Sequence, residues 1–570
     1  MRPATAFRLC ATGLALLCAL VAVRPPAAEA ASYTKITGSG STWSSNALDQ
    51  WRRNISANLG MTVNFKAVGS SQGREQFRNG VVDFAVSEIP YGLTEQGVTD
   101  NPPARGYAYM PIVAGGTAFM YNLKIGGRKV TNLRLSGAVL AKVFTGAITM
   151  WNAPEIRADN PGLTLPARRI VPVVRSDGSG TTAQFTTWLA KEQGAVWNDY
   201  CGRTGRGGSC GMTSYYPVLS GSSMIAKSGS LGVSGFVRQP QAEGSITYVE
   251  YSYAIKTGFP VAKVLNKSNY YVEPTASSVA VALTGARINQ DKNSPNYLTQ
   301  ILDGVYRNGD KRTYPLSSYS YMILPTSIGG DKNPMNAAKG NSLGTFARYF
   351  LCDGQQQAEE LGYSPLPKNL VQAGFDQVRR VPGAPTSGVD INDCRNPTFS
   401  GGRNTLLDNA PQPKDCDRKG STQCSDGTAG AKSNTPVNQG AQGRGNTSGG
   451  SATGGSGSTT GGSGATGGTG GAGADSDGDG TPDAQESAAA TTTGGGTVDP
   501  DTGELVSGDG TGLGDNSVVA NPVNLASGQQ FGLRGALMAL SAVLLVAVVV
   551  GPPLTARMLS ARARRKGETA

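Results

Sequence analysis

The apolar positions between residues 32 and 400 follow two alternating patterns. Residues 62–68 alternate like a half-buried strand, and residues 81–86 and 170–174 are short apolar runs of strand length. Residues 43–59 carry apolar side chains at helical spacing, which predicts a helix with one buried face. Strands that alternate with helices predict an α/β architecture with open, mainly parallel sheets.

Two longer apolar runs lie near the ends of the chain. Residues 1–30 combine early arginines, a short apolar run and a small-residue cleavage site, so we interpret them as a signal peptide rather than a buried helix. Residues 535–556 are long and apolar enough for one transmembrane helix, and the basic tail 557–570 follows directly. The sequence therefore predicts a single-pass protein at the extracellular face of the cell membrane, with a cytoplasmic C-terminus.

Composition separates a folded region from a linker. The chain of 570 residues contains 79 glycines, many of them in residues 421–530, which are rich in Gly, Ser and Thr. Such a segment cannot bury a core, so we expect a disordered linker of about 50–60 Å between its ends. The folded domain is then expected over residues 31–420.

Histidine is absent, and the cysteine count is even once the signal peptide is removed. The absence of histidine excludes Ser-His-Asp and Cys-His catalysis and any histidine-ligated metal site. Six cysteines remain outside the signal peptide, and six allow fifteen pairings. We favour the disulfides between sequence neighbours: Cys201–Cys210, Cys352–Cys394 and Cys416–Cys424. Of the net charge of +11, the signal peptide and tail carry +6, and the remaining +5 is too mild to imply nucleic-acid binding but suits a small anionic ligand.

Three turns rich in Gly, Ser and Thr stand between a predicted strand and a predicted helix: residues 38–42, 69–73 and 175–182. A helix N-terminus offers free N–H groups, glycine permits close approach, and hydroxyls add donors, so each turn can cradle an anion. The alternative is that they are ordinary helix N-caps. Arg175 adds a permanent charge to the third turn, and no turn has the spacing of a P-loop or dinucleotide motif.

A fourth segment, residues 83–90, ends a predicted strand with Glu88, which is either a ligand contact or a surface glutamate. These four segments, with residues 151–156, 160–163, 188–189 and 244–254, resemble the phosphate-binding protein of the phosphate-specific ABC transporter, the PstS family. The resemblance covers roughly residues 33–380. It implies a two-lobed, periplasmic-binding-protein-like fold of type II that closes on one dehydrated phosphate.

The resemblance also implies the ligand contacts, by position. They are Thr42, Trp43 through its backbone, Ser70, Glu88, Arg175, Ser179, Gly180 and Thr181, with Asp177 orienting Arg175. The family usually has Asp at position 88 and Phe at position 43, so both residues depart from its pattern. A carboxylate can accept the proton that phosphate still carries at neutral pH, whereas sulfate has none to give.

The expected function is capture of inorganic phosphate for uptake by an ABC permease, without enzymatic activity and without a required cofactor. The alternative is a surface display or adhesion protein that keeps the fold without an uptake role. A phosphatase with a serine nucleophile is disfavoured, because the sequence has neither histidine nor a clear metal-ligand cluster.

One motif in the linker has the spacing of a calcium loop. Residues 475–486 place oxygen ligands at loop positions 1, 3, 5, 9 and 12, with glycine at position 6. The ligands would be Asp475, Asp477, Asp479, Asp483 and Glu486. The alternative is an acidic stretch in a disordered linker, because no amphipathic helices flank the loop.

Overall fold

The computed structural model describes residues 33–438, except for 96, 292, 295–296, 331, 386–390 and 401–402, together with the short strands β20 (Thr497–Val498) and β21 (Leu505–Val506). The predicted signal peptide, calcium loop, transmembrane helix and basic tail, and all but these strands of the linker beyond residue 438, lie outside the described residues. Within the described residues, no helix is both long and apolar enough to cross a membrane.

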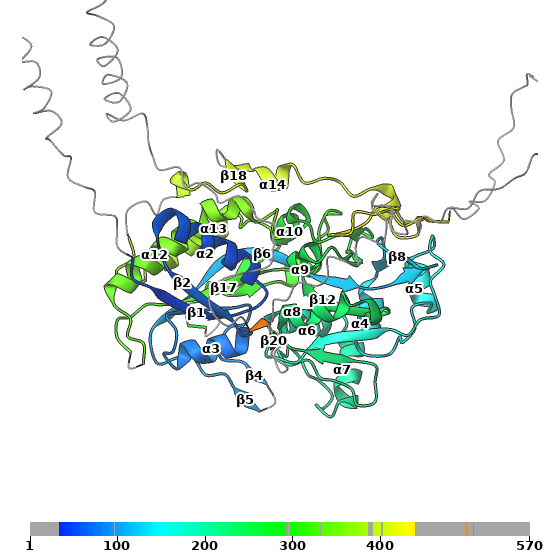
Figure 1. Ribbon diagram of the computed structural model, residues 1–570, viewed down its shortest axis with the longest axis horizontal. Helices are drawn as coiled ribbons and strands as arrows, with labels where there is room; N and C mark the ends of the chain where they lie inside the picture. The colour runs from blue at the N-terminus through cyan, green and yellow to red at the C-terminus, as the bar shows by residue number, and fades with distance from the viewer. Residues whose placement is uncertain are drawn as a thin grey trace, which may run out of the picture. The chain divides into compact units, whose positions relative to one another are not determined.

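One eight-stranded sheet organises the domain, in the order β11-β10-β12-β6-β17-β3-β1-β2. The strand β6 (Tyr107–Tyr121) is long enough to pair with β17 along one part and with β12 along the other, so it joins two halves (Figure 1). The first half contains β1 (Ile36–Gly40), β2 (Val63–Ala67), β3 (Phe84–Ser87) and β17 (Ser317–Pro325). The second half contains β10 (Val171–Arg175), β11 (Ile225–Lys227) and β12 (Ser245–Glu250).

The main sheet is mixed, with four parallel and three antiparallel strand pairings. Within each half the predicted parallel pairing is present, because β1 runs parallel to β2 and β3, and β10 runs parallel to β11 and β12. The strands β6 and β17 run antiparallel to each of their neighbours in the sheet. An apolar run predicts a strand but carries no information about its direction, so the sequence could not reveal these two returning strands.

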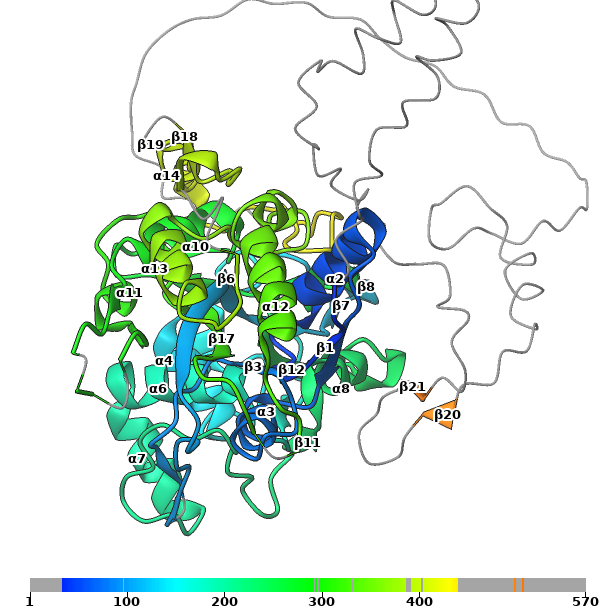
Figure 2. The ribbon, with the colours of Figure 1, turned by 90° about the vertical axis from the view of Figure 1, so that its left-hand side faces the viewer.

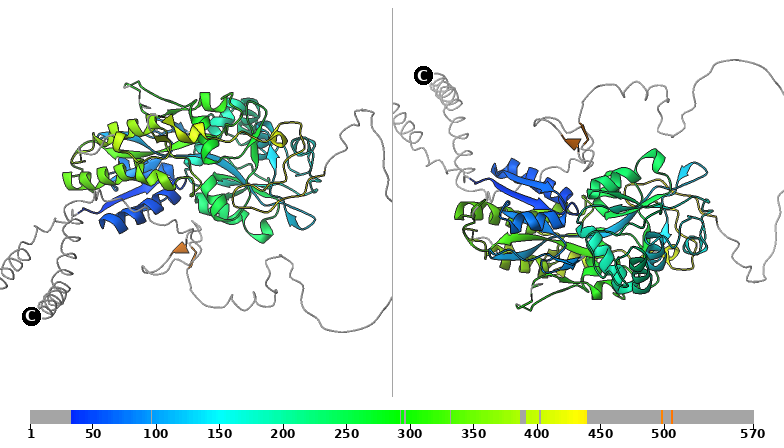
Figure 3. Two further views of the ribbon diagram at one scale, coloured as in Figure 1. Left: turned by 90° about the horizontal axis from the view of Figure 1, so that it is seen from above. Right: turned by 90° about the horizontal axis from the view of Figure 1, so that it is seen from below.

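Helices pack against both halves (Figures 2 and 3). The first half carries α2 (Ser45–Leu59), α3 (Ser70–Arg78), α12 (Ala337–Leu351) and α13 (Lys368–Val378). The second half carries α6 (Gly180–Glu192), α7 (Gly194–Arg203), α8 (Gly229–Val237) and α9 (Tyr251–Lys256). The other helices are α4 (Gly137–Phe144), α5 (Pro154–Asp159), α10 (Ala276–Leu283), α11 (Asp303–Tyr306) and α14 (Thr405–Asp408).

The remaining described strands are short and pair outside the main sheet. They are β4 (Thr94–Glu95) with β5 (Val98–Thr99), β7 (Lys124–Ile125) with β8 (Arg128–Lys129), β9 (Arg134–Leu135) with β13 (Lys263–Leu265) and β14 (Tyr271–Val272), β15 (Arg287–Ile288) with β16 (Gln300–Ile301), and β18 (Phe399–Ser400) with β19 (Arg403–Asn404).

The predicted amphipathic helix is α2, and its apolar face is buried from Ala47 to Ile55. Trp51 of α2 stacks on Phe350 of α12 with 5.1 Å between the ring centroids, and Ile55 is completely enclosed. Each such side chain contributes about 1.5–3 kcal/mol relative to an exposed position. The buried face fixes α2, and with it the turn at residues 41–44 that precedes the helix.

The three predicted disulfides are confirmed: Cys201–Cys210, Cys352–Cys394 and Cys416–Cys424. The packed region extends past the expected linker start at residue 421, because residues up to 438 contact the second half. Asn132 donates to the Cys424 carbonyl at 2.7 Å, and Thr131 donates to the Ser433 carbonyl at 2.7 Å. Polar contacts and a disulfide hold this segment in place without large apolar side chains, which is why composition alone suggested a linker.

Candidate functional site

The ends of β1, β2, β3 and β10 bring all four predicted segments to one place between the halves. Every predicted ligand contact is buried, and the most exposed, Thr42, has an exposed fraction of 8%. The two halves meet closely at Gly180, where an added Cβ would lie 1.8 Å from the Glu88 Oε2 atom and 2.6 Å from the Ser70 Oγ atom. Only glycine fits at this position, because a Cβ atom would clash with Glu88 and Ser70.

Glu88 is an interior residue, so its interpretation as a surface glutamate is wrong. It has an exposed fraction of 1%, and three serine hydroxyls donate to its carboxylate. Ser41 and Ser70 donate to Oε2 at 2.7 and 2.9 Å, and Ser320 donates to Oε1 at 2.6 Å. Burial raises the pKa of Glu88, and the three hydroxyl hydrogen bonds lower it by less, so the net pKa is raised.

A buried ion pair lies in the second half, in the turn between β10 and α6. The Arg175 Nε atom donates to Asp177 Oδ1 at 2.7 Å, and a second guanidinium nitrogen donates to Oδ2. Burial disfavours both charges, but the attraction between them outweighs it, so the pKa of Asp177 is lowered and that of Arg175 is raised. The structure thus places Asp177 against Arg175 and keeps both groups ionised inside the domain.

The start of α6 supplies directed donors next to this charge. Ser179 is the N-cap of the helix, and its Oγ accepts from the Thr182 N–H at 3.2 Å. Thr181 has an exposed fraction of 1%, and within the described residues its Oγ1 atom has no hydrogen-bond partner. A buried hydroxyl without a partner is costly, so Thr181 marks a position where a ligand would complete the hydrogen bonding.

The N-cap alternative applies to only one of the three turns. Ser44 and Gly69, the N-caps of α2 and α3, make no side-chain cap hydrogen bond, whereas Ser179 does. In the first turn, the Trp43 N–H donates to Ser41 Oγ at 3.0 Å, and the Thr42 hydroxyl lies 2.8 Å from the Ser230 hydroxyl across the two halves.

Sequence reasoning missed three serines that contact the site: Ser41, Ser230 and Ser320. Ser230 also accepts from Arg175 Nη1 at 3.2 Å. A signal for Ser230 was present, because Ser228-Gly229-Ser230 is a fourth Gly/Ser turn between a strand and the helix α8. Ser320 lies within β17 and has no local motif, so only the sheet order could place it beside Glu88.

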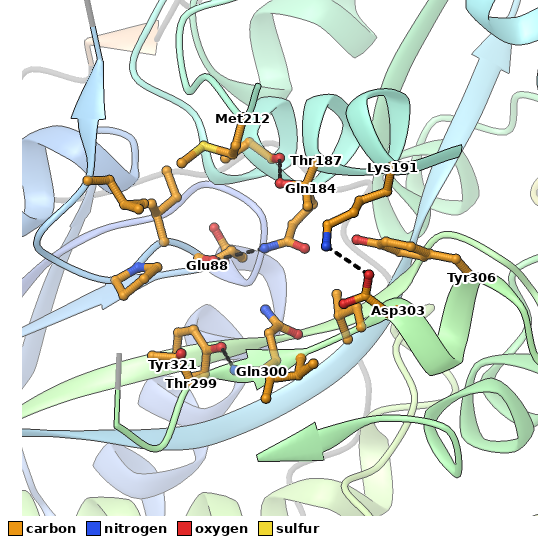
Figure 4. A pocket seen from close by; sticks show the side chains of 16 residues that line it. Glu88, Gln184, Thr187, Lys191, Met212, Thr299, Gln300, Asp303, Tyr306 and Tyr321 are labelled. Atoms are coloured by element: carbon orange, nitrogen blue, oxygen red, sulfur yellow. Dashed lines mark hydrogen bonds and ion pairs between the residues drawn. The ribbon is translucent and has the colours of Figure 1, made fainter. Parts of the chain in front are cut away.

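A cavity of about 290 Å³ lies beside Glu88, between α6 and residues 299–306 (Figure 4). Gln184 of α6 donates to the Glu88 carbonyl at 2.9 Å, and Lys191 pairs with Asp303 at 2.8 Å. Glu88 is the one predicted contact among its lining residues, so we do not place the anion there. Over the described residues there is no cluster of three His, Cys, Asp or Glu side chains that could hold a metal ion.

The raised pKa of Glu88 predicts a specific pH dependence of stability. A carboxyl group whose folded pKa lies above its unfolded value of about 4.3 stabilises the fold below that value, and this contribution is lost as the pH rises through the folded pKa. The unfolding free energy of the wild type, relative to Glu88→Gln, should therefore fall by about 1.4 kcal/mol for each pH unit between the two pKa values.

Denaturant unfolding of both ligand-free proteins across this range measures the difference. Glu75→Gln is the matched control, because Glu75 is an exposed glutamate on α3. A difference between wild type and Glu88→Gln that does not change with pH would contradict the assignment.

Comparison with known proteins identifies the family of the chain. A family model described as a PBP superfamily domain matches residues 25–354. The chain is 31% identical over 351 residues to the phosphate-binding protein PstS of Xylella fastidiosa, covering 61% of this chain and 86% of that protein. It is 31% identical over 341 residues to the phosphate-binding protein PstS 2 of Mycobacterium tuberculosis, covering 59% of this chain and 84% of that protein.

Solved structures of similar proteins include a phosphate-binding protein from Stenotrophomonas maltophilia, at 18% identity and a TM-score of 0.44, which covers 60% of this chain and 92% of that one. The extent of the family match and the identity to the curated relatives decide the assignment. The chain belongs to the PstS family of phosphate-binding proteins, within the PBP superfamily.

Proposed function

We propose that the domain binds one inorganic phosphate between its two halves, at the start of α6. The observation that carries this proposal is the buried, unpartnered hydroxyl of Thr181, which stands at a helix N-terminus in the turn that follows Arg175. A helix N-terminus, a permanent charge and a free hydroxyl together favour an anion. The curated relatives, which are named as phosphate-binding proteins, support phosphate as that anion.

Each predicted contact has a distinct role in this proposal. Arg175 supplies the charge, and the N–H groups of Gly180 and Thr181 supply directed donors. The hydroxyls of Thr42, Ser179 and Thr181 complete the donor set. The Ser70 hydroxyl and the Trp43 N–H donate to Glu88 and Ser41 in the structure, so each would exchange that acceptor for the anion. Glu88 is the acceptor, which suits an anion that still carries a proton. Binding, rather than catalysis, fits a chain that has no histidine to activate a nucleophile.

We also propose that phosphate is passed to an ABC permease and that residues 535–556 anchor the chain in the cell membrane. The two-half architecture and the PstS relatives support the transport role. The anchor rests on the apolar run and the basic tail of the sequence. Protease added to intact cells should release the domain, and a domain that stays attached while the tail is cut would contradict this topology.

Calorimetric titration of the full chain with phosphate tests the proposed ligand. We expect saturable binding of one phosphate per chain, because the proposed site lies at one helix N-terminus, the start of α6. A matched titration with chloride at the same ionic strength should give no saturable heat. Absence of a phosphate signal in folded protein would contradict the proposal and favour a display protein that keeps the fold alone.

A further inference from the structure

A second contact between the two halves lies outside the predicted phosphate site. The hairpin of β4 and β5 extends from the first half, and its residue Glu95 reaches the second half. Ser214 donates to the Glu95 carboxylate through its N–H, at 3.0 Å to both oxygens, and through its hydroxyl, at 2.7 Å to Oε2. Hydrogen bonds to a carboxylate are about twice as strong as those between neutral groups.

The hairpin is firmly fixed to the first half. At its base, the Asp100 N–H donates to the Leu93 carbonyl at 2.9 Å. The Asp100 carboxylate accepts from Arg74 at 2.6 Å and from Arg78 at 3.1 Å, and both arginines belong to α3. The helix α3 begins at Ser70, so the same helix anchors the hairpin and carries a predicted phosphate contact.

The other side of the contact is fixed to the start of α6. The Ser179 N–H donates to the Ser214 carbonyl at 3.0 Å, and the Thr213 N–H donates to the Thr186 hydroxyl at 3.0 Å. Ser214 is buried, with an exposed fraction of 1%. A continuous set of hydrogen bonds therefore joins Glu95 to the N-cap of α6 through one residue.

We propose that Glu95 is a positioning residue that holds the two halves closed around the bound anion. It acts through Ser214 on Ser179 and makes no contact with the position of the anion. The identity of the bound anion in this inference rests on the proposed function. The contact of Thr42 with Ser230 involves a predicted phosphate contact, whereas Glu95 stabilises the closed arrangement without serving as one. Ser71 adds a weaker, uncharged contact to the same residue, donating to the Ser214 hydroxyl at 3.2 Å.

Substitution of Glu95 should increase the rate at which the two halves open more than it changes the rate at which phosphate associates. Glu95 is half-buried, so removing its hydrogen bonds should raise the phosphate dissociation rate roughly tenfold and leave the association rate nearly unchanged. Glu95→Gln keeps one acceptor oxygen and should give an intermediate rate.

The control is Glu75→Ala. Glu75 and Glu95 line the same cleft of about 1010 Å³ between the halves, so the two substitutions change the local charge alike. Glu75 is exposed on α3, and its loss should leave the dissociation rate unchanged.

The experiment measures phosphate dissociation by stopped-flow fluorescence in the full chain and in the Glu95→Ala, Glu95→Gln and Glu75→Ala variants. Hydrogen exchange of the peptide spanning residues 176–186 is followed in the ligand-free proteins, because it reports the start of α6 whether or not phosphate is the ligand. We expect exchange in Glu95→Ala to be roughly tenfold faster than in the wild type. Glu95→Gln remains informative if the alanine variant does not fold.

Unchanged exchange and dissociation in both Glu95 variants would overturn the proposal. Equal changes in Glu75→Ala would also overturn it, because they would show an effect of net charge. A wild type that binds no phosphate would refute the proposed function, while faster exchange confined to the Glu95 variants would still support the positioning role.

Discussion

Arg175→Ala should abolish measurable phosphate binding. The substitution removes the one positive charge that the predicted site holds, and it leaves the Asp177 carboxylate, which Arg175 now neutralises, facing the anion. Loss of charge-assisted hydrogen bonds costs about 1.5–3 kcal/mol, and repulsion by Asp177 adds to this loss. We therefore expect affinity to fall by more than about a hundredfold, as measured by calorimetry.

The same substitution should also destabilise the fold, since breaking a buried ion pair from one side costs about 3–5 kcal/mol. The double variant Arg175→Ala with Asp177→Ala separates the two effects. It removes both buried charges, so it should recover much of the stability but none of the binding. A double variant that binds phosphate like the wild type would show that Arg175 serves the fold rather than the ligand.

The local parts of this site could be predicted from the sequence. Three turns could be recognised because each has glycine and hydroxyl residues between an apolar run and a helix: residues 38–42, 69–73 and 175–182. The structure brings all three to the boundary between the two halves, where β1 and β2 of the first half and β10 of the second half end. Apolar periodicity was sufficient to locate each turn along the chain, because short-range patterns determine where strands stop and helices begin.

The parts that depend on long-range pairing could not be predicted. Ser320 donates to Glu88 from 232 positions away along the chain, and it does so because β17 pairs antiparallel with β3. Glu95 likewise contacts Ser214 from 119 positions away. Neither residue has a motif around it, because its role is determined by which strands become neighbours and not by its own sequence context.

Glu88→Gln should weaken phosphate binding and at the same time improve sulfate binding. The Glu88 carboxylate can accept a hydrogen bond from the proton of phosphate. An unprotonated anion in the same place has no proton to donate, so its oxygen and the carboxylate oxygen repel each other. Replacing the carboxylate by an amide removes a charge-assisted bond worth about 1.5–3 kcal/mol, so phosphate affinity should fall at least roughly tenfold. Sulfate should gain, because the amide N–H of glutamine can donate to it.

Glu88→Asp is the matched control for this prediction, since it keeps the charge and restores the residue that the family usually carries. Its selectivity should stay in favour of phosphate, although the shorter side chain loses reach toward Ser320, which now donates to Oε1 at 2.6 Å. Calorimetry with phosphate and sulfate on the wild type and both variants measures the ratio directly. An unchanged ratio in Glu88→Gln would mean that Glu88 contributes hydrogen bonds to Ser41, Ser70 and Ser320 for the fold alone, and that another group decides which anion is bound.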